Sequence, residues 1–374
     1  MLLFDPRPKT RRQDLFDREE ELEAFKRYIE ERAPLVLLLG LRRTGKTSLL
    51  LTGLNEIHVD YIFVDLRILE EKMPVTRRDI IVLLERAIAD FMRRTSFRKK
   101  LTKYLERVEG LSVAGLEVKV SWRTKPYYFI SELFMELNSW AEDTGRHLVV
   151  AFDEAQEFAR TYRVELDRIL AYVYDHMRNV TVVLTGSKIG LLYRFLKIGD
   201  PKAPLYGRAF LEIKLGYFTQ EMSLEFLRRG FEEHGVRVNE NTLNYVVSLL
   251  NGVPGWLALY GYYAINYGVS DEVLDKVLRE ASATALSELE HFLEIRPQAR
   301  RRYLTILKYL ASVSGAKWSE VKRYLEAEEG VRIDDKNFST LLKNLVDSGF
   351  IEKSDIGYRV PDPVLKYALR RKVS

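Results

Sequence analysis

The stretch Pro34-Leu-Val-Leu-Leu-Leu39, followed by Gly40-Leu-Arg-Arg-Thr-Gly-Lys-Thr47, decides the fold of this chain. The apolar run predicts a buried strand, and residues 40–47 match the pattern G-x-x-x-x-G-K-S/T directly after it. The next residues, Ser48-Leu-Leu-Leu51, favour a helix. Backbone N–H groups of such a glycine-rich turn, backed by a helix N-terminus, form a concave anion site. This order of elements predicts a site for the phosphates of a nucleotide.

The residues of this loop have separate expected roles. Lys46 would reach the β- and γ-phosphates, and the Thr47 hydroxyl would hold Mg²⁺. The guanine-reading pattern N-K-x-D is missing from the sequence, which favours ATP/ADP over guanine nucleotides. The expected nucleotide-binding residues of the loop are Gly40, Arg43, Thr44, Gly45, Lys46, Thr47 and Ser48.

A second apolar strand, Leu148-Val-Val-Ala-Phe152, ends in Asp153-Glu154. Asp153 at the strand end is placed to hold Mg²⁺ through water. Glu154 is placed to orient or deprotonate an attacking water molecule. The alternative is that the two acids merely begin a loop or cap a helix. Two adjacent carboxylates after a buried strand are costly, so beside a phosphate loop the metal and catalytic roles are favoured.

Four further residues have both a functional and a structural interpretation. After the strand at 180–185, Ser187 or Thr185 would contact the γ-phosphate, or would only form a turn. Arg208 in Pro204-Leu-Tyr-Gly-Arg208, expected near the carboxyl edge of the sheet, would stabilise charge on the transferred phosphoryl group or pair with a surface acid. Pro254 would pack on adenine or simply start a helix.

Strands alternate with helices in the first part of the chain, which predicts an α/β fold with a parallel sheet covered by helices on both faces. Asp17 is a candidate N-cap for a helix over 16–29, with Glu20 three residues later. A further strand is expected at 59–65, and a helix at 78–107. The alternating stretch 111–122, broken at Ala114-Gly115, predicts a β-hairpin inserted into this core.

The second part of the chain is predicted to be helical, at 219–234, 240–250, 254–266 and 270–291. Three more helices, at 300–312, 317–327 and 335–348, precede a hairpin around residues 355–357. Three helices followed by a hairpin are typical of a winged helix-turn-helix. We therefore expect three domains: a P-loop core at 1–216 with its insertion near 108–123, a helical lid at 217–294, and a winged helix at 295–374.

The winged helix is a candidate contact surface for a partner. Residues from Arg296 to Ser374 include 17 lysines and arginines against 10 acids, whereas the rest of the chain is slightly acidic. The N-terminal end of the recognition helix is itself acidic, with Asp335 as a candidate N-cap, which counts against DNA. The partner is therefore left open between protein and duplex DNA. Expected contact residues are Lys336, Asn337, Thr340, Lys343 and Asn344.

Composition excludes several classes of protein. The chain has no cysteine and five scattered histidines, so disulfides and a structural metal site are not expected. It shows neither a signal peptide nor an apolar run long enough for a membrane, which predicts a cytoplasmic protein with no membrane contact. High charge with few glutamines favours a thermophilic source.

Several segments together resemble one known family, the archaeal ATPases of the STAND class of P-loop NTPases, which are related to AAA+ proteins. They are Leu15-Phe-Asp-Arg-Glu-Glu-Glu-Leu22, the loop with its double arginine, Phe152-Asp-Glu-Ala-Gln156, Leu184-Thr-Gly-Ser-Lys-Ile-Gly-Leu-Leu192, Pro204-Leu-Tyr-Gly-Arg208 and Gly252-Val-Pro-Gly-Trp256. The resemblance covers nearly the whole chain. It implies a sheet with an additional strand between the P-loop strand and the Asp153 strand, and a helical lid.

The resemblance also implies residue roles and an activity. Phe16, Asp17 and Arg18 would lie at the adenine or ribose, Arg208 would sense the γ-phosphate, and Pro254 would contact the base. Slow ATP hydrolysis would drive a switch between closed and open domain arrangements. Alternatives are a replication-initiator-like AAA+ ATPase that binds DNA and a nucleotide-binding scaffold without turnover. A helicase is not favoured, because a second motor core is missing.

Overall fold

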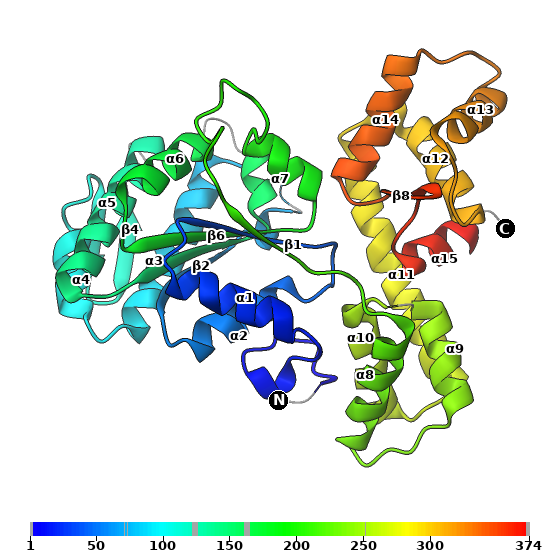
Figure 1. Ribbon diagram of the computed structural model, residues 1–374, viewed down its shortest axis with the longest axis horizontal. Coiled ribbons are helices and arrows are strands. Elements are labelled where there is room, and N and C mark those ends of the chain that lie inside the picture. The colour runs from blue at the N-terminus through cyan, green and yellow to red at the C-terminus, as the bar shows by residue number, and fades with distance from the viewer. Residues whose placement is uncertain are drawn as a thin grey trace. The chain divides into compact units, whose positions relative to one another are not determined.

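The structure is a computed structural model that describes residues 3–70, 72, 74–121, 126–160, 165–250 and 252–371. The chain forms two compact units (Figure 1). The first unit consists of Lys9–Leu41 and Lys46–Leu215. The second unit consists of Gly216–Ser374 together with Arg42–Gly45 and the N-terminal segment up to Pro8. Residues from the phosphate loop and from the N-terminus therefore group with the C-terminal part.

A five-stranded sheet forms the centre of the first unit, in the order β2-β5-β6-β1-β7. Every neighbouring pair in this sheet is parallel. The strands are β1 (Leu35–Leu39), β2 (Asp60–Asp65), β5 (Leu148–Asp153), β6 (Val180–Gly186) and β7 (Leu211–Lys214). Strand β6 separates β1 from β5, so the additional strand that the resemblance implied is confirmed, as is the parallel α/β fold.

The two faces of the sheet are covered by different helices, because successive side chains of a strand point to opposite faces. In β1, Leu35, Leu37 and Leu39 belong to one hydrophobic core, while Val36 and Leu38 belong to the other. Helices α1 (Glu19–Glu30) and α2 (Lys46–Glu56) build the second core. The first core is built by α3 (Arg77–Arg94), α4 (Arg98–Leu105), α5 (Pro126–Thr144), α6 (Leu166–His176) and α7 (Ile189–Phe195).

The hairpin of β3 (Leu111–Ala114) and β4 (Glu117–Val120) forms a separate antiparallel sheet. Its turn includes Gly115 with φ of +66°, a conformation that glycine adopts without strain. The hairpin lies where the alternating sequence placed it, although residues 122 and 123 of the expected insertion are outside the described residues. The helix expected over 78–107 is two helices, α3 and α4, because the chain is extended at Thr95.

The second unit contains helices and one small β-sheet, and its winged helix-turn-helix is confirmed. The winged part ends in the antiparallel pair β8–β9, and Ala316 makes an additional bridge to Tyr358. The elements of the whole second unit are α8 (Gln220–Glu232), α9 (Glu240–Leu250), α10 (Pro254–Tyr267), α11 (Asp271–Glu294), α12 (Arg300–Ser312), α13 (Trp318–Glu329), α14 (Asp335–Asp347), β8 (Glu352–Ser354), β9 (Gly357–Arg359) and α15 (Pro363–Arg371).

The N-terminal segment is fixed to the helices of the second unit by Phe4. The Phe4 ring is fully buried, with ring centroids 5.7 Å from Phe226 and 5.0 Å from Phe231. Glycines 230 and 261 make room for it, since a Cβ added at either position would lie 2.3 Å from the ring. The segment is therefore part of this hydrophobic core.

Replacing Phe4 by alanine is expected to lower the free energy of unfolding of the second unit by about 3–5 kcal/mol, because it removes a buried ring and leaves a cavity. Chemical denaturation followed by tryptophan fluorescence, to which the buried Trp256 of this unit contributes, measures this loss. Phe4→Leu refills most of the volume, so its free energy of unfolding should fall much less. A loss below about 1 kcal/mol for Phe4→Ala would contradict the assignment of Phe4 to the core.

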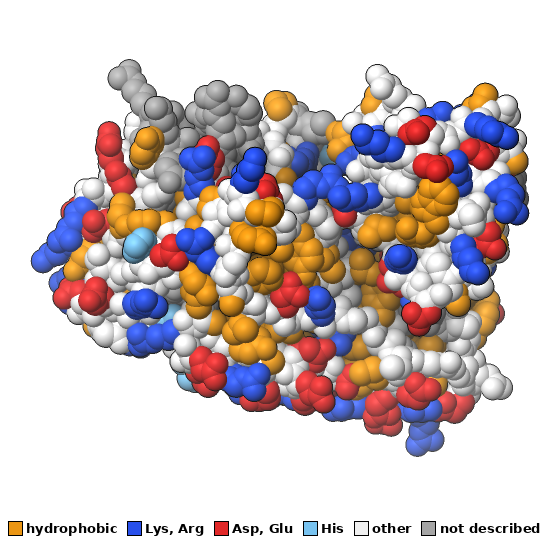
Figure 2. All heavy atoms as spheres, turned by 45° about the horizontal axis from the view of Figure 1, so that its top comes forward, with side chains coloured by type: hydrophobic (Ala, Val, Ile, Leu, Met, Phe, Trp, Pro, Cys, Tyr) orange, Lys and Arg blue, Asp and Glu red, His pale blue; other side chains and the backbone are white. Residues whose placement is uncertain are grey.

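The surface carries charges of both signs. Figure 2 shows Lys and Arg side chains interspersed with Asp and Glu side chains over the viewed face. Many of these are paired, such as Lys26 with Glu23 and Arg228 with Glu240. Among the described residues, no helix has both the length and the apolar character that crossing a membrane requires.

Candidate nucleotide-binding and catalytic site

The phosphate loop connects β1 to α2, as the sequence predicted. Strand β1 ends at Leu39 and α2 begins at Lys46, so the first amides of α2 face the loop. The turn is made by left-handed residues, with φ of +63° at Arg43 and +95° at Gly45. Lys46 is only 5% exposed, and its ammonium donates to the carbonyl oxygens of Gly40 and Leu41, both at 2.9 Å. The loop thus presents N–H donors and one fixed cation, which suits a phosphate chain.

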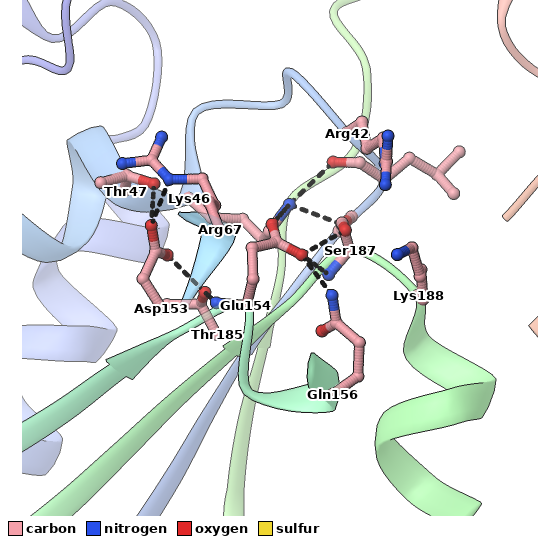
Figure 3. A network of polar contacts seen from close by, with 12 residues as sticks. Arg42, Lys46, Thr47, Arg67, Asp153, Glu154, Gln156, Thr185, Ser187 and Lys188 are labelled. Atoms are coloured by element: carbon pink, nitrogen blue, oxygen red, sulfur yellow. Dashed lines mark hydrogen bonds and ion pairs between the residues drawn. The ribbon is translucent and has the colours of Figure 1, made fainter. Parts of the chain in front are cut away.

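Asp153, at the end of β5, is held by two threonines. The Thr47 hydroxyl donates to Asp153 Oδ2 at 2.9 Å, and the Thr185 hydroxyl donates to Oδ1 at 2.5 Å (Figure 3). Burial is the main cause that raises the pKa of Asp153, and the neighbouring Glu154 adds to it, while the two hydroxyls and Arg67 oppose the shift. A hydroxyl and a carboxylate oxygen are the hard donors that Mg²⁺ prefers.

The donor set fits a Mg²⁺ ion that arrives with a nucleotide. Among the described residues, no group of three or more Asp, Glu, His or Cys side chains is arranged to hold a metal by itself. Mg²⁺ commonly takes one or two protein oxygens and completes its shell with phosphates and water. Thr47 and Asp153 match that pattern.

Glu154 follows Asp153 in a conformation that is rare for a residue with a side chain, with φ of +56°. Such strained residues cluster at active sites, where surrounding contacts hold them. Here Glu154 N–H donates to the Thr185 hydroxyl at 2.9 Å, and Glu154 Oε2 accepts from Gln156 Nε2 at 2.5 Å. The Ser187 hydroxyl and its N–H, the latter at 3.2 Å, also donate to Oε2. Glu154 Oε1 lies 3.7 Å from Lys46 Nζ, so the carboxylate is fixed beside the phosphate loop.

The structure thus brings together Lys46, Thr47, Asp153, Glu154 and Ser187. Sequence reasoning placed no site role on Gln156, which orients Glu154, or on Arg67, whose Nε lies 3.5 Å from Asp153 Oδ2. The position of each residue in the sequence could have revealed its role. Each follows the end of a parallel strand, and ligand-binding residues gather at such ends.

The segment before α1 does not have the predicted cap. Helix α1 begins at Glu19 with Arg18 as its N-cap and no side-chain capping bond, so Asp17 as the N-cap is wrong. Asp17 has φ of +50°, whereas an N-cap residue typically has an extended backbone. Arg18 is buried and pairs with Glu21 at 3.1 Å. The adenine and ribose roles of Phe16, Asp17 and Arg18 stay predictions.

Arg208 lies elsewhere in the first unit. Its guanidinium pairs with Asp175, with Nε–Oδ1 and Nη2–Oδ2 distances of 3.0 and 2.5 Å. Arg208 precedes β7, which runs parallel to β1, and Asp175 lies in the last turn of α6, before β6. Both therefore lie near the amino-terminal ends of the strands, so the predicted position at the carboxyl edge is wrong. The structure does not bring Arg208 to Lys46, and its γ-phosphate role stays a prediction.

Four predicted nucleotide-binding residues belong to the second unit, namely Arg43, Thr44, Gly45 and Pro254. Pro254 is the first residue of α10, as in its structural interpretation. The Arg43 guanidinium lies 4.0 Å above the Trp256 ring and donates to Glu288 at 2.7 Å, and Arg42 pairs with the same carboxylate at 2.6 Å. Burial disfavours the charge on Glu288, but the two arginines outweigh it and lower its pKa.

The remaining loop positions have local partners. Thr44 is buried, and the Ser48 hydroxyl accepts a hydrogen bond from the Lys9 N–H at 3.0 Å. Their contacts with nucleotide stay predictions.

The recognition helix α14 exposes Lys336, Asn337, Thr340 and Lys343. Asn344 differs, because its amide donates to the Tyr303 hydroxyl at 2.9 Å inside the winged helix. The N-cap is Asp334, which accepts from the Asn337 N–H at 3.0 Å, so Asp335 as the cap is wrong. Asp335 pairs with Lys322 at 2.5 Å.

The fold and site define a P-loop ATPase with a C-terminal winged helix. Residues 15–259 match the sequence profile of an ATPase domain found predominantly in Archaea, and the chain belongs to this family. Residues 297–360 match the C-terminal winged helix-turn-helix domain of MCM proteins. Among proteins with curated descriptions, no significant match to this sequence is found.

Solved structures support the same classification. The Walker-type ATPase Paby2304 of Pyrococcus abyssi is 37% identical, with a TM-score of 0.81 over 99% of this chain and 100% of that chain. The ORC2 protein of Aeropyrum pernix, solved in ADPNP–ADP complexes, is 14% identical, with a TM-score of 0.62 over 99% of this chain and 98% of that chain. The latter similarity concerns the fold alone. The family and the first structure support nucleotide binding and ATP hydrolysis in general.

Proposed function

We propose that the chain is a Mg²⁺-dependent ATPase that acts as a nucleotide-driven molecular switch. The observation that carries this proposal is the contact of the phosphate loop with the end of β5. The Thr47 hydroxyl donates to Asp153 at 2.9 Å, and Glu154 Oε1 lies 3.7 Å from Lys46 Nζ. A triphosphate with Mg²⁺ and a diphosphate would make different contacts with these residues, so the bound nucleotide changes the free energy of the conformations that the chain can adopt.

Each residue of the site has a chemical role in this proposal. Lys46 and the loop amides bind the phosphates, and Thr47 and Asp153 hold Mg²⁺, which neutralises phosphate charge when bound. Glu154, oriented by Ser187 and Gln156, positions the attacking water and accepts its proton. Hydrolysis then replaces a triphosphate by a diphosphate in the loop, which supplies the differential contact that a switch requires.

The output of the switch is proposed to be a contact of the winged helix with a protein or nucleic-acid partner. The exposed side chains of α14, including Lys336 and Lys343, support a surface contact. A second candidate function, a DNA-binding ATPase related to replication initiators, is favoured by the match of residues 297–360 to a winged helix of MCM proteins. Binding to duplex DNA that falls steeply with salt, with a slope of several phosphates, would favour this candidate; no binding at low salt would remove it.

The switch is testable by a distance measurement between the units. The natural chain has no cysteine, so Lys103→Cys in the first unit and Tyr245→Cys in the second introduce the only two labelling sites. Both positions are exposed. In the Glu154→Gln background, we expect the distance distribution between spin labels with Mg·ATP to differ from that with Mg·ADP.

The matched control is the same labelled pair with Lys46→Ala added, which should give one distribution under both conditions. Identical distributions with ATP and ADP in a protein that binds both nucleotides would refute the switch and leave a nucleotide-binding scaffold or a simple ATPase.

A further inference from the structure

Arg67 is a cation at the metal-binding end of the site. It begins the 3-10 helix η2 (Arg67–Leu69), directly after β2, and the pairing of β2 with β5 aligns Asp65 with Asp153. Arg67 Nε and Nη2 donate to the two oxygens of Asp65 at 2.9 and 2.5 Å. Arg67 Nε also lies 3.5 Å from Asp153 Oδ2, the same oxygen that accepts from Thr47 (Figure 3).

The electrostatics explain why a cation is held at this place. Asp65, Asp153 and Glu154 bring three carboxylates to one edge of the sheet, and Asp153 has no exposed surface. Like charges at this spacing repel strongly in a partly buried site. The hydrogen bonds to Asp65 are the main cause that raises the pKa of Arg67, and the charges of Asp153 and Glu154 add to it. Arg67 is therefore a permanent counter-ion for this cluster.

The backbone that follows Arg67 is anchored by a second ion cluster, in which Glu157 is buried. Arg160 donates to the carbonyl oxygens of Leu69, Glu70 and Lys72 at 2.7 to 2.8 Å. Glu157, which is 1% exposed, pairs with Arg160 and with Lys188, both at 2.8 Å.

This anchor has a consequence for the motion that Arg67 can make. Arg160 and Glu157 lie in the 3-10 helix η3 (Ala155–Arg160), which directly follows Glu154. The loop after β2 is thereby fixed to the segment that carries the catalytic carboxylate. The Arg67 side chain, 44% exposed, retains the freedom to leave one carboxylate while it keeps the other.

We propose that Arg67 is a positioning residue that competes with Mg²⁺ for Asp153. In this inference, which rests on the proposed Mg·ATP site, Arg67 neutralises Asp153 until the metal takes over that oxygen, and then stays paired with Asp65 alone. Two cations cannot both lie against Asp153 Oδ2 without repulsion. Arg67 thereby sets the Mg²⁺ concentration that nucleotide binding requires. This effect comes from the charge of Arg67 and needs no contact between Arg67 and a phosphate.

The test measures the Mg²⁺ dependence of binding rather than turnover. A fluorescent ADP analogue is titrated into wild type, Arg67→Gln and Arg67→Lys at a series of Mg²⁺ concentrations, and binding is followed by anisotropy. Arg67→Gln removes the charge, and we expect its half-saturating Mg²⁺ concentration to fall at least about fivefold. Arg67→Lys keeps a charge that competes, so it should stay within about twofold of wild type. Arg168→Gln, on the exposed surface of α6, removes a remote charge and should leave the half-saturating Mg²⁺ concentration unchanged.

A second measurement uses Mg²⁺ alone. Because Arg67→Gln leaves Asp65 and Asp153 without their counter-ion, Mg²⁺ without nucleotide should raise its melting temperature more than that of wild type. An unchanged Mg²⁺ dependence in Arg67→Gln, or weaker nucleotide binding both with and without Mg²⁺, would overturn the competition. The second result would make Arg67 a phosphate ligand instead. Wild type that binds no nucleotide at any Mg²⁺ concentration would refute the proposed function itself, which separates the two failures.

Discussion

Replacing Lys46 by alanine is expected to weaken ATP binding at least about 100-fold, because charged hydrogen bonds to two phosphate groups are lost. The Lys46 ammonium is held at the mouth of the loop by the carbonyl oxygens of Gly40 and Leu41, both at 2.9 Å. It is nearly fully buried, so little side-chain entropy remains to be lost when a phosphate binds. Titration with a fluorescent ATP analogue, at saturating Mg²⁺, measures the change.

The matched control is Lys103→Ala, which removes a lysine from the exposed surface of α4 and should leave the affinity unchanged. Circular dichroism should show both variants folded, since Lys46 begins a helix whose core residues are untouched. An affinity of Lys46→Ala within about threefold of wild type would show that the loop does not bind the triphosphate as proposed.

The parts of the site that the sequence predicts are those in which one short segment carries both the fold and the chemistry. The loop at residues 40–47 and the pair Asp153-Glu154 each follow an apolar strand directly. A strand end in a parallel sheet fixes where the next residues lie. Local periodicity likewise predicted the winged helix, because its short helices each have an apolar face.

The parts that the sequence does not predict depend on which strands are neighbours. Arg67 reaches Asp153 because β2 pairs with β5, 83 residues or more apart in the chain, and no local pattern states that pairing. The position of Arg208 was mistaken for the same reason, since the direction of β7 decides at which edge a residue before it lies. Phe4 enters the helical core through two distant glycines, which only the folded chain brings together.

The predicted N-cap residues of two helices, α1 and α14, were each wrong by one position. In α14 the chain offers Asp334 and Asp335 side by side, and either has the right chemistry for an N-cap. In the structure, Asp334 accepts the N–H of Asn337, while Asp335 pairs with Lys322 at 2.5 Å. Lys322 comes from α13, so the partner of Asp335 is a tertiary contact that the local sequence does not state.

Replacing Glu154 by glutamine is expected to leave ATP binding within about threefold of wild type and to slow hydrolysis about 10²–10⁴-fold. The shape of the side chain is kept, so the phosphate loop is undisturbed. The amide, however, cannot accept a proton from water. It also replaces an anionic acceptor that Gln156 and Ser187 now share at Oε2. Single-turnover phosphate release, together with equilibrium binding of the ATP analogue, measures both quantities in the same preparation.

The comparison needs controls that separate chemistry from position. Glu142→Gln changes an exposed carboxylate on α5 and should hydrolyse ATP like wild type. Gln156→Ala leaves the Glu154 carboxylate in place but removes one of its donors, so an intermediate rate is expected. If Glu154→Gln releases phosphate at the wild-type rate, another group must orient the water, and the left-handed backbone at Glu154 would then need a structural reason. If wild type binds ATP but releases no phosphate, the site is a nucleotide-binding scaffold, and any switching would have to come from nucleotide exchange.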